Sequence, residues 1–165
     1  MIKNFLFLVI ISIFFITFTC YSQTEKIHFG IKYSVKNHQF LMVNDVPNHK
    51  MGLASGTGVA FMKDERTANV DVFFIYDYIN GAGTFLENYI VHMSDSSLIT
   101  IKGEGNTYGD EYNPMFTANV TITNGTGTYS GIKGTGKMTG DRKAVLNENT
   151  IINLYFDLEY YFGNY

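Results

Sequence analysis

The chain has 165 residues, with 12 basic and 15 acidic side chains and a formal net charge of −3 at pH 7. This mild acidity argues against a nucleic-acid partner, because neutralising phosphates requires clustered Lys and Arg. The chain has a single cysteine, which excludes a disulfide framework, and its four histidines are too scattered for metal-ligand spacing, so we expect no metal site.

Residues 1–22 are typical of a cleavable secretory signal. Lys3 supplies a short positive region, an apolar run extends from Phe5 to Phe18, and small residues stand at the −3 and −1 positions before Gln23. We therefore expect an exported bacterial protein whose mature part, residues 23–165, forms one domain with no transmembrane span.

Two alternatives for this segment stay open. A retained membrane anchor is disfavoured because a span needs about 20 apolar residues. Lipid attachment through Cys20 is disfavoured because the bulky Phe18 fits a lipobox poorly.

Most of the remaining chain has the composition of β-strands separated by turns. The expected strands are Lys26–Val35, Leu53–Met62, Asn69–Tyr78, Thr84–Met93, Leu98–Glu104, two within Phe116–Gly140, and Thr150–Phe162, the last being the longest. The expected irregular segments are Gln39–Lys50, Asn106–Pro114 and Asp141–Asn149. About eight strands without a helical apolar stripe predict an all-β, eight-stranded antiparallel β-barrel.

The segment Phe116–Gly140 carries the strongest pattern. Apolar and polar residues alternate from Phe116 to Thr123, as in a half-buried strand, and closely spaced glycines follow. Glycines clustered in this way mark corners where a sheet curls to close, and closure would also remove exposed strand edges.

This region resembles the allene oxide cyclase barrel-like group, which includes the plant dirigent proteins. The resemblance rests on the motif Asn124-Gly-Thr-Gly-Thr-Tyr-Ser-Gly-Ile-Lys-Gly-Thr-Gly136. In addition, His92–Gly103 is similar to the strand that precedes this motif in that group. The resemblance covers about Thr84 to Thr139. The usual N-terminal motif of the group is missing, so no catalytic residue can be transferred.

The resemblance implies an eight-stranded barrel with an apolar cavity, often assembled as a dimer or trimer, so a homo-oligomer is one expectation. Plant members of the group cyclise an epoxy fatty acid or steer the coupling of phenoxy radicals, and some bacterial relatives shape polyketide cyclisation.

Two nearby carboxylates on the last strand are the first catalytic candidates. Tyr155, Asp157 and Glu159 share one face, and the two carboxylates have Cα atoms about 6.8 Å apart. On a cavity wall, desolvation and mutual repulsion would raise one pKa and suit that group to acid–base chemistry. The continuous apolar face opposite favours the alternative that this face is simply solvated.

Other candidates lie on strands with mixed faces. Asp71 is a weak catalytic candidate, and Phe73 shares its face. Glu87 and Tyr89 share one side of the next strand and His92 lies on the other; with Phe73 they are the candidate ligand-binding residues. We expect no cofactor, because Gly134-Thr-Gly-Lys137 lacks both the first glycine and the helix of a phosphate-binding loop.

Three functions remain in contention. We prefer an exported barrel that binds a small apolar ligand or a partner, because no set of catalytic residues can be recognised in the sequence. A cofactor-free isomerase or cyclase would need a cavity with a desolvated carboxylate and a hydrogen-bonding neighbour. A structural or interaction module would have a barrel plugged by its own side chains.

Overall fold

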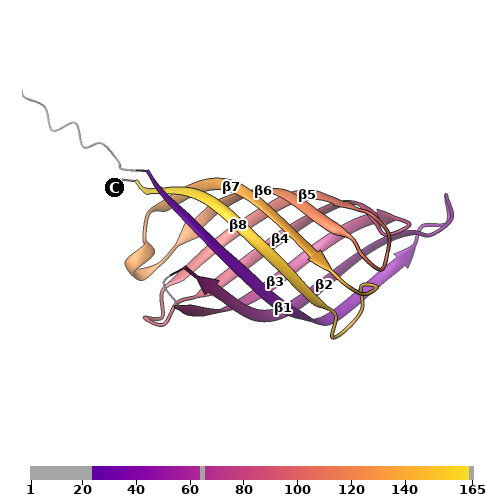
Figure 1. Cartoon of the computed structure of the whole chain (residues 1–165), viewed down its shortest axis with the longest axis horizontal. Helices are drawn as coiled ribbons and strands as arrows, with labels where there is room; N and C mark the ends of the chain where they lie inside the picture. The colour runs from indigo at the N-terminus through magenta and orange to yellow at the C-terminus, as the bar shows by residue number, and fades with distance from the viewer. Residues whose placement is uncertain (1–23, 64–65, 164–165) are drawn as a thin grey trace, which may run out of the picture.

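The computed structural model describes residues 24–63 and 66–163, in which eight strands form a closed antiparallel barrel (Figure 1). The strands are β1 (Glu25–Met42), β2 (His49–Met62), β3 (Thr67–Ile79), β4 (Ala82–His92), β5 (Leu98–Tyr108), β6 (Met115–Gly125), β7 (Ile132–Arg142) and β8 (Ile151–Phe162), with a 3₁₀ segment at Gly127–Tyr129. Each strand pairs with the next and β8 pairs with β1, so the predicted fold is confirmed. The predicted signal at residues 1–22 and Cys20 lie outside the described residues.

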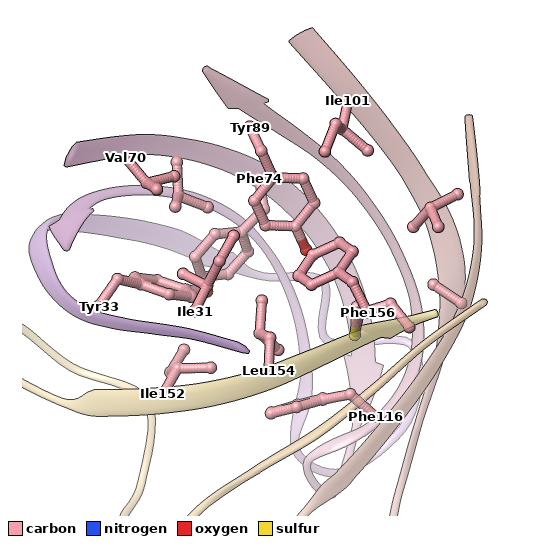
Figure 2. Close-up of a cluster of buried hydrophobic side chains, with 14 of the residues drawn as sticks. Ile31, Tyr33, Val70, Phe74, Tyr89, Ile101, Phe116, Ile152, Leu154 and Phe156 are labelled. Carbon is pink, nitrogen blue, oxygen red and sulfur yellow. The ribbon is translucent and has the colours of Figure 1, made fainter. Parts of the chain in front are cut away.

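Alternation of side chains creates the core. Along β3 and β6, buried residues alternate with exposed or half-buried ones almost without interruption, which places one face of each strand inside the barrel. Apolar side chains from all eight strands fill this interior, many of them large or aromatic, as Figure 2 shows for Tyr33, Phe74, Tyr89 and Phe156. The barrel is thus packed by its own side chains along much of its length.

The β1–β2 hairpin differs from the prediction of an irregular segment over Gln39–Lys50. β1 continues to Met42 and β2 starts at His49, with Met42 paired to Lys50, so only the residues between them form a loop. Asn44 and Asn48 adopt positive φ there and reverse the chain around Pro47. Pairing between the two arms overrides their weak local strand signals, and the hairpin reaches beyond the other strands at one end of the barrel (Figure 1).

Other predicted boundaries also need correction. β5 extends through Tyr108, into the segment predicted as a loop, and β7 extends through Arg142. The longest strand is β1, with 18 residues, rather than β8, with 12. In each case the extra residues follow the register of a neighbouring strand, which their own composition does not reveal.

The glycines after β6 have two roles, of which only one is a turn. Gly127 and Gly131 adopt positive φ at the ends of the 3₁₀ segment and make the corner. Gly134 and Gly136 lie inside β7 instead, where an added methyl group would meet the backbone and side chains of β8 at 3.0 Å or less. The interior wall therefore needs these glycines because the opposing strand approaches so closely.

Candidate functional site

The first candidate site is a carboxyl group inside the barrel. Glu87 of β4 points inward with Tyr89, and the Tyr89 hydroxyl donates a hydrogen bond to Glu87 Oε2. Both residues are buried, at 6 % and 0 % exposure. The inward position of Glu87 follows from the alternation of β4, whose Phe85 and Val91 lie on the same buried face.

Burial determines the chemistry of this carboxyl group. It raises the pKa of Glu87 from its ordinary value of 4.5 to about 7, and the nearby hydroxyls of Tyr89 and Tyr33 oppose only part of that rise. The phenol pKa values of Tyr33 and Tyr89 are also raised, first by burial and then by the charge of Glu87. A carboxyl group with such a pKa can donate or accept a proton near neutral pH.

The Tyr33 hydroxyl is the polar atom without a partner in this cluster. It is fully buried and makes no hydrogen bond of acceptable geometry among the described residues. The Glu87 carboxyl group is close enough to Tyr33 to influence its pKa, but without a well-formed hydrogen bond the buried hydroxyl costs about 1–3 kcal/mol.

A second group of polar side chains fills the interior toward the β1–β2 hairpin. Thr107 Oγ1 donates to the Tyr78 hydroxyl at 2.7 Å, and His38 Nε2 lies 2.7 Å from the Tyr76 hydroxyl. Arg142 is 2 % exposed, and its Nε donates to the carbonyl of Ala144 at 2.9 Å. Burial lowers the pKa of Arg142, and no carboxylate of the described residues lies at ion-pair distance from its guanidinium.

The second candidate site is a groove on the outer surface, with a volume of about 1020 Å³. One row of outward residues crosses the sheet through it, in register from strand to strand: Gln39, Leu53, Ile75, Leu86, Glu104 and Asn119. A neighbouring row adds Leu41, Met51, Asp77, Thr84 and Asn106. The groove is therefore mainly apolar over β1–β4, where Gln39, Asp77 and Thr84 are its polar residues, and polar over β5 and β6.

The exposure of the apolar part is unusual. Leu53, Ile75 and Leu41 are 51 %, 54 % and 76 % exposed although they adjoin one another. Contiguous exposed apolar side chains on a protein surface mark ligand or interaction sites more often than isolated ones do.

The candidates on the last strand lie on the solvated face. Tyr155, Asp157 and Glu159 are exposed, whereas the intervening Phe156 and Leu158 are buried. Asp157 pairs with His28 at 3.2 Å and Glu159 with Lys26 at 2.9 Å. The arrangement matches the solvated-face alternative, although Tyr155 and Asp157 do line a second surface hollow of about 610 Å³.

The remaining candidates divide between the two sides of the wall. Asp71 and His92 lie outside and pair at 2.9 Å, and Phe73 is exposed on the same face. Glu87 and Tyr89 lie inside and are the only two of the candidates that the structure brings together in the interior.

Sequence reasoning missed several residues of both sites. Arg142 fell in a segment predicted as a polar connection, and Tyr33 in a strand with no visible polar partner. The row of Leu53, Ile75 and Leu86 depends on the register between strands, which the sequence does not display. The alternation along β3 did place Ile75 on the same face as Asp77 and Phe73, but not beside Leu53 and Leu86.

No group of three or more His, Cys, Asp or Glu among the described residues could hold a metal ion. Within the same residues, no helix has the length and apolar character needed to cross a membrane.

No family model matches the chain, and no curated protein sequence matches it. The solved structures that resemble it include two dirigent proteins. The pterocarpan synthase dirigent protein PsPTS1 is 14 % identical with a TM-score of 0.50, and the match covers 87 % of this chain and 97 % of that one. The pterocarpan synthase dirigent protein GePTS1 is 13 % identical with a TM-score of 0.49, covering 87 % of each chain. At this identity the first likeness supports a dirigent-like eight-stranded barrel fold and carries no activity with it.

Proposed function

We propose that this protein is a binding barrel that holds a small, mainly apolar molecule in the outer groove. The observation that carries the proposal is the groove itself, where Leu53, Ile75 and Leu86 form a continuous apolar floor. Its volume of about 1020 Å³ is at the upper end of the range typical of small-molecule sites, which are mostly apolar with a few polar groups.

The polar end of the groove indicates that the ligand also carries a polar group. Glu104, Asn106 and Asn119 lie beside the apolar floor and offer carboxylate and amide groups for hydrogen bonds. A ligand with an apolar body and a hydroxyl or amino group at one end matches this arrangement, because each part then meets a surface of its own kind.

We also infer that the protein is exported and that it belongs with bacterial members of the allene oxide cyclase barrel-like group. The signal-like segment at residues 1–22 and the glycine motif at Asn124–Gly136 support these inferences. Detection of the mature chain beginning at Gln23 outside the cytoplasm would test the export step.

A second candidate function is a cofactor-free isomerase or cyclase that uses Glu87 as the proton-transfer group. The raised pKa of Glu87 and its hydrogen bond from Tyr89 favour it. We place it second because both residues are buried behind packed side chains, so a substrate could reach them only after the barrel opened.

The groove proposal can be tested with two matched substitutions on β3. Ile75 lies in the groove and Phe73 lies outside it, while both point outward with exposures of 54 % and 51 %. We expect Ile75→Gln to weaken binding of the neutral fluorescent probe N-phenyl-1-naphthylamine by about tenfold, and Phe73→Gln to leave it within about twofold.

Mass spectrometry of compounds retained by the purified protein would complete this test. Equal probe binding by both variants would contradict the groove as the site. A retained compound that takes up solvent deuterium with the wild type, but not with Glu87→Gln, would favour the second candidate function instead.

A further inference from the structure

The barrel closes, yet one strand edge stays open. Pairing of β1 with β8 ends at Ser34 and Ile151, and two backbone bonds of Val35, to Thr150 and Asn149, follow at 3.0 and 2.8 Å. Pairing of β1 with β2 continues to Met42. Residues 36–42 of β1 therefore have a neighbouring strand on one side only.

The backbone groups of this open edge can be assigned. The Val43 N–H donates to the His49 carbonyl at 3.0 Å, across the β1–β2 ladder. Backbone groups of successive residues alternate in direction along a strand, so those of His38, Phe40 and Met42 point away from β2. No strand of the described chain lies on that side.

Most of the edge also lacks the features that usually prevent pairing. Lys36, at the bulge between Val35 and Asn37, is the one charged residue of the edge, and the segment from Asn37 to Met42 has no proline, no Asp, Glu, Lys or Arg, and no bulge. Phe40, Leu41 and Met42 are 48 %, 76 % and 43 % exposed. Such an edge is a template for an added strand.

We propose that this open edge of β1 pairs with the same edge of a second copy of the chain, antiparallel and about a two-fold axis at Phe40. Phe40 then faces Phe40 of the second copy, and His38 faces Met42 of the second copy on either side of the axis. Each of these pairs exchanges two backbone hydrogen bonds, so every donor and acceptor of the open edge gains a partner.

The side chains make the edge complementary to itself. No like charges face each other in this register, and the central contact is between two aromatic rings, a stabilising cross-strand pair. On the outer face, Leu41 would lie against Gln39 of the second copy, which covers the most exposed apolar side chain of the hairpin. One patch that serves both partners is the arrangement that two-fold dimers use.

The inference is independent of the proposed ligand. Gln39 and Leu41 also line the groove, so the second copy would extend the groove wall. Binding of a ligand is not needed for the strands to pair.

Disulfide trapping tests the register directly. The full chain carries Cys20→Ser, which removes its single cysteine, together with Phe40→Cys. Residues facing each other in a hydrogen-bonded pair have Cα atoms about 5.5 Å apart, which suits a disulfide. We expect mild oxidation to give a covalent dimer in high yield, whereas Phe73→Cys, on the outward face of β3 with similar exposure, gives little.

A proline substitution tests the backbone bonds. Phe40→Pro removes an N–H that points to the open edge and none that bonds to β2, so the hairpin keeps its ladder. We expect sedimentation analysis to show a dimer for the wild type and a dissociation constant about tenfold higher or more for Phe40→Pro, with Phe40→Thr weakened less because it keeps the N–H.

Three results would overturn the proposal. They are a monomeric wild type with no trapping through Phe40→Cys, a dimer that Phe40→Pro leaves unchanged, and a different polypeptide bound at the edge of a monomer. If Phe40→Pro fails to fold by circular dichroism, the yield of the disulfide trap alone decides between dimer and monomer.

Discussion

Glu87 shows how one residue can couple the stability of the barrel to pH. Its carboxyl group is surrounded by Tyr89, Tyr33 and apolar side chains, so the protonated form is the favoured one in the folded state. In the unfolded chain the same group ionises near its ordinary pKa of 4.5. Between 4.5 and about 7 the folded state therefore binds more protons than the unfolded state, and stability falls as pH rises through this window.

Replacing Glu87 with Gln should remove this pH dependence. A pKa raised to about 7 corresponds to roughly 3 kcal/mol of stability that is present below pH 4.5 and lost by pH 8. We expect Glu87→Gln to match the wild type near pH 4.5 and to exceed it at pH 8, as measured by urea unfolding at each pH. Glu104→Gln, an exposed carboxylate on β5, is the control and should change little.

A wild type that becomes more stable as pH rises from 5 to 8, relative to Glu87→Gln, would contradict this assignment. It would mean that the carboxylate is ionised and satisfied in the folded interior. Such a result would also weaken the second candidate function, which needs a group that exchanges protons near neutral pH.

The roles of individual residues were harder to predict from the sequence than the fold was. The alternation of β4 already placed Glu87 and Tyr89 on one face, and the structure keeps them together. Their neighbour Tyr33 is more than fifty positions away in the chain, and only barrel closure brings its ring to the same interior. The two carboxylates of β8 had the more conspicuous spacing and lie in solvent, as the continuous apolar face opposite them had favoured.

At the scale of elements, glycines on one strand make room for aromatic rings on the neighbouring strands. Gly58 of β2 is paired with Tyr33 of β1, and Gly52 lies beneath the ring of Tyr76 of β3. A methyl group added at Gly58 would lie 2.5 Å from Cα and Cβ of Tyr33. Because these glycines have no side chain on the inner face, a large ring fits beside them, and they allow the sheet to curve more sharply.

Alanine substitutions at two glycines should therefore differ in their effect on stability. Gly58→Ala forces atoms of β1 apart and should cost about 1–3 kcal/mol. Gly30→Ala adds its methyl group on the outer face, where the nearest atoms lie at 3.6 and 3.9 Å, and should be neutral or stabilising by up to about 1 kcal/mol. Thermal unfolding of both variants checks the contrast, and equal losses would show that packing inside the wall is not the reason for Gly58.

Element boundaries were predictable only where the local pattern was strong. β3 and β6 were found nearly at their observed bounds because alternation runs through them. The arms of the β1–β2 hairpin were missed because Asn37-His-Gln-Phe-Leu-Met42 has no alternation and Pro47 suggested a loop. Pairing with a partner strand, and not composition, keeps these arms extended.

For the whole molecule, closure links the two ends of the described chain. Glu25 pairs with Tyr160 and Ser34 with Ile151, so the seam between β1 and β8 joins residues that are far apart in sequence. The eight strands were predictable because turn signals recur along the chain, and the glycine motif suggested that the sheet closes. The outer groove was not predictable, because its rows exist only once six strands are in register.

Closure should make the barrel unfold as one unit. Leu154 of β8 lies on the inner side of the seam at 1 % exposure, and its neighbour Tyr155 lies on the outer side at 60 %. We expect Leu154→Ala to lower the free energy of unfolding by about 3 kcal/mol and Tyr155→Ala by about 0.5 kcal/mol or less. Far-ultraviolet circular dichroism and tyrosine fluorescence should report one coincident transition in both variants, since opening the seam exposes the shared interior. Separate transitions for the two probes, or equal losses for the two variants, would show that β8 is not an integral part of a closed wall.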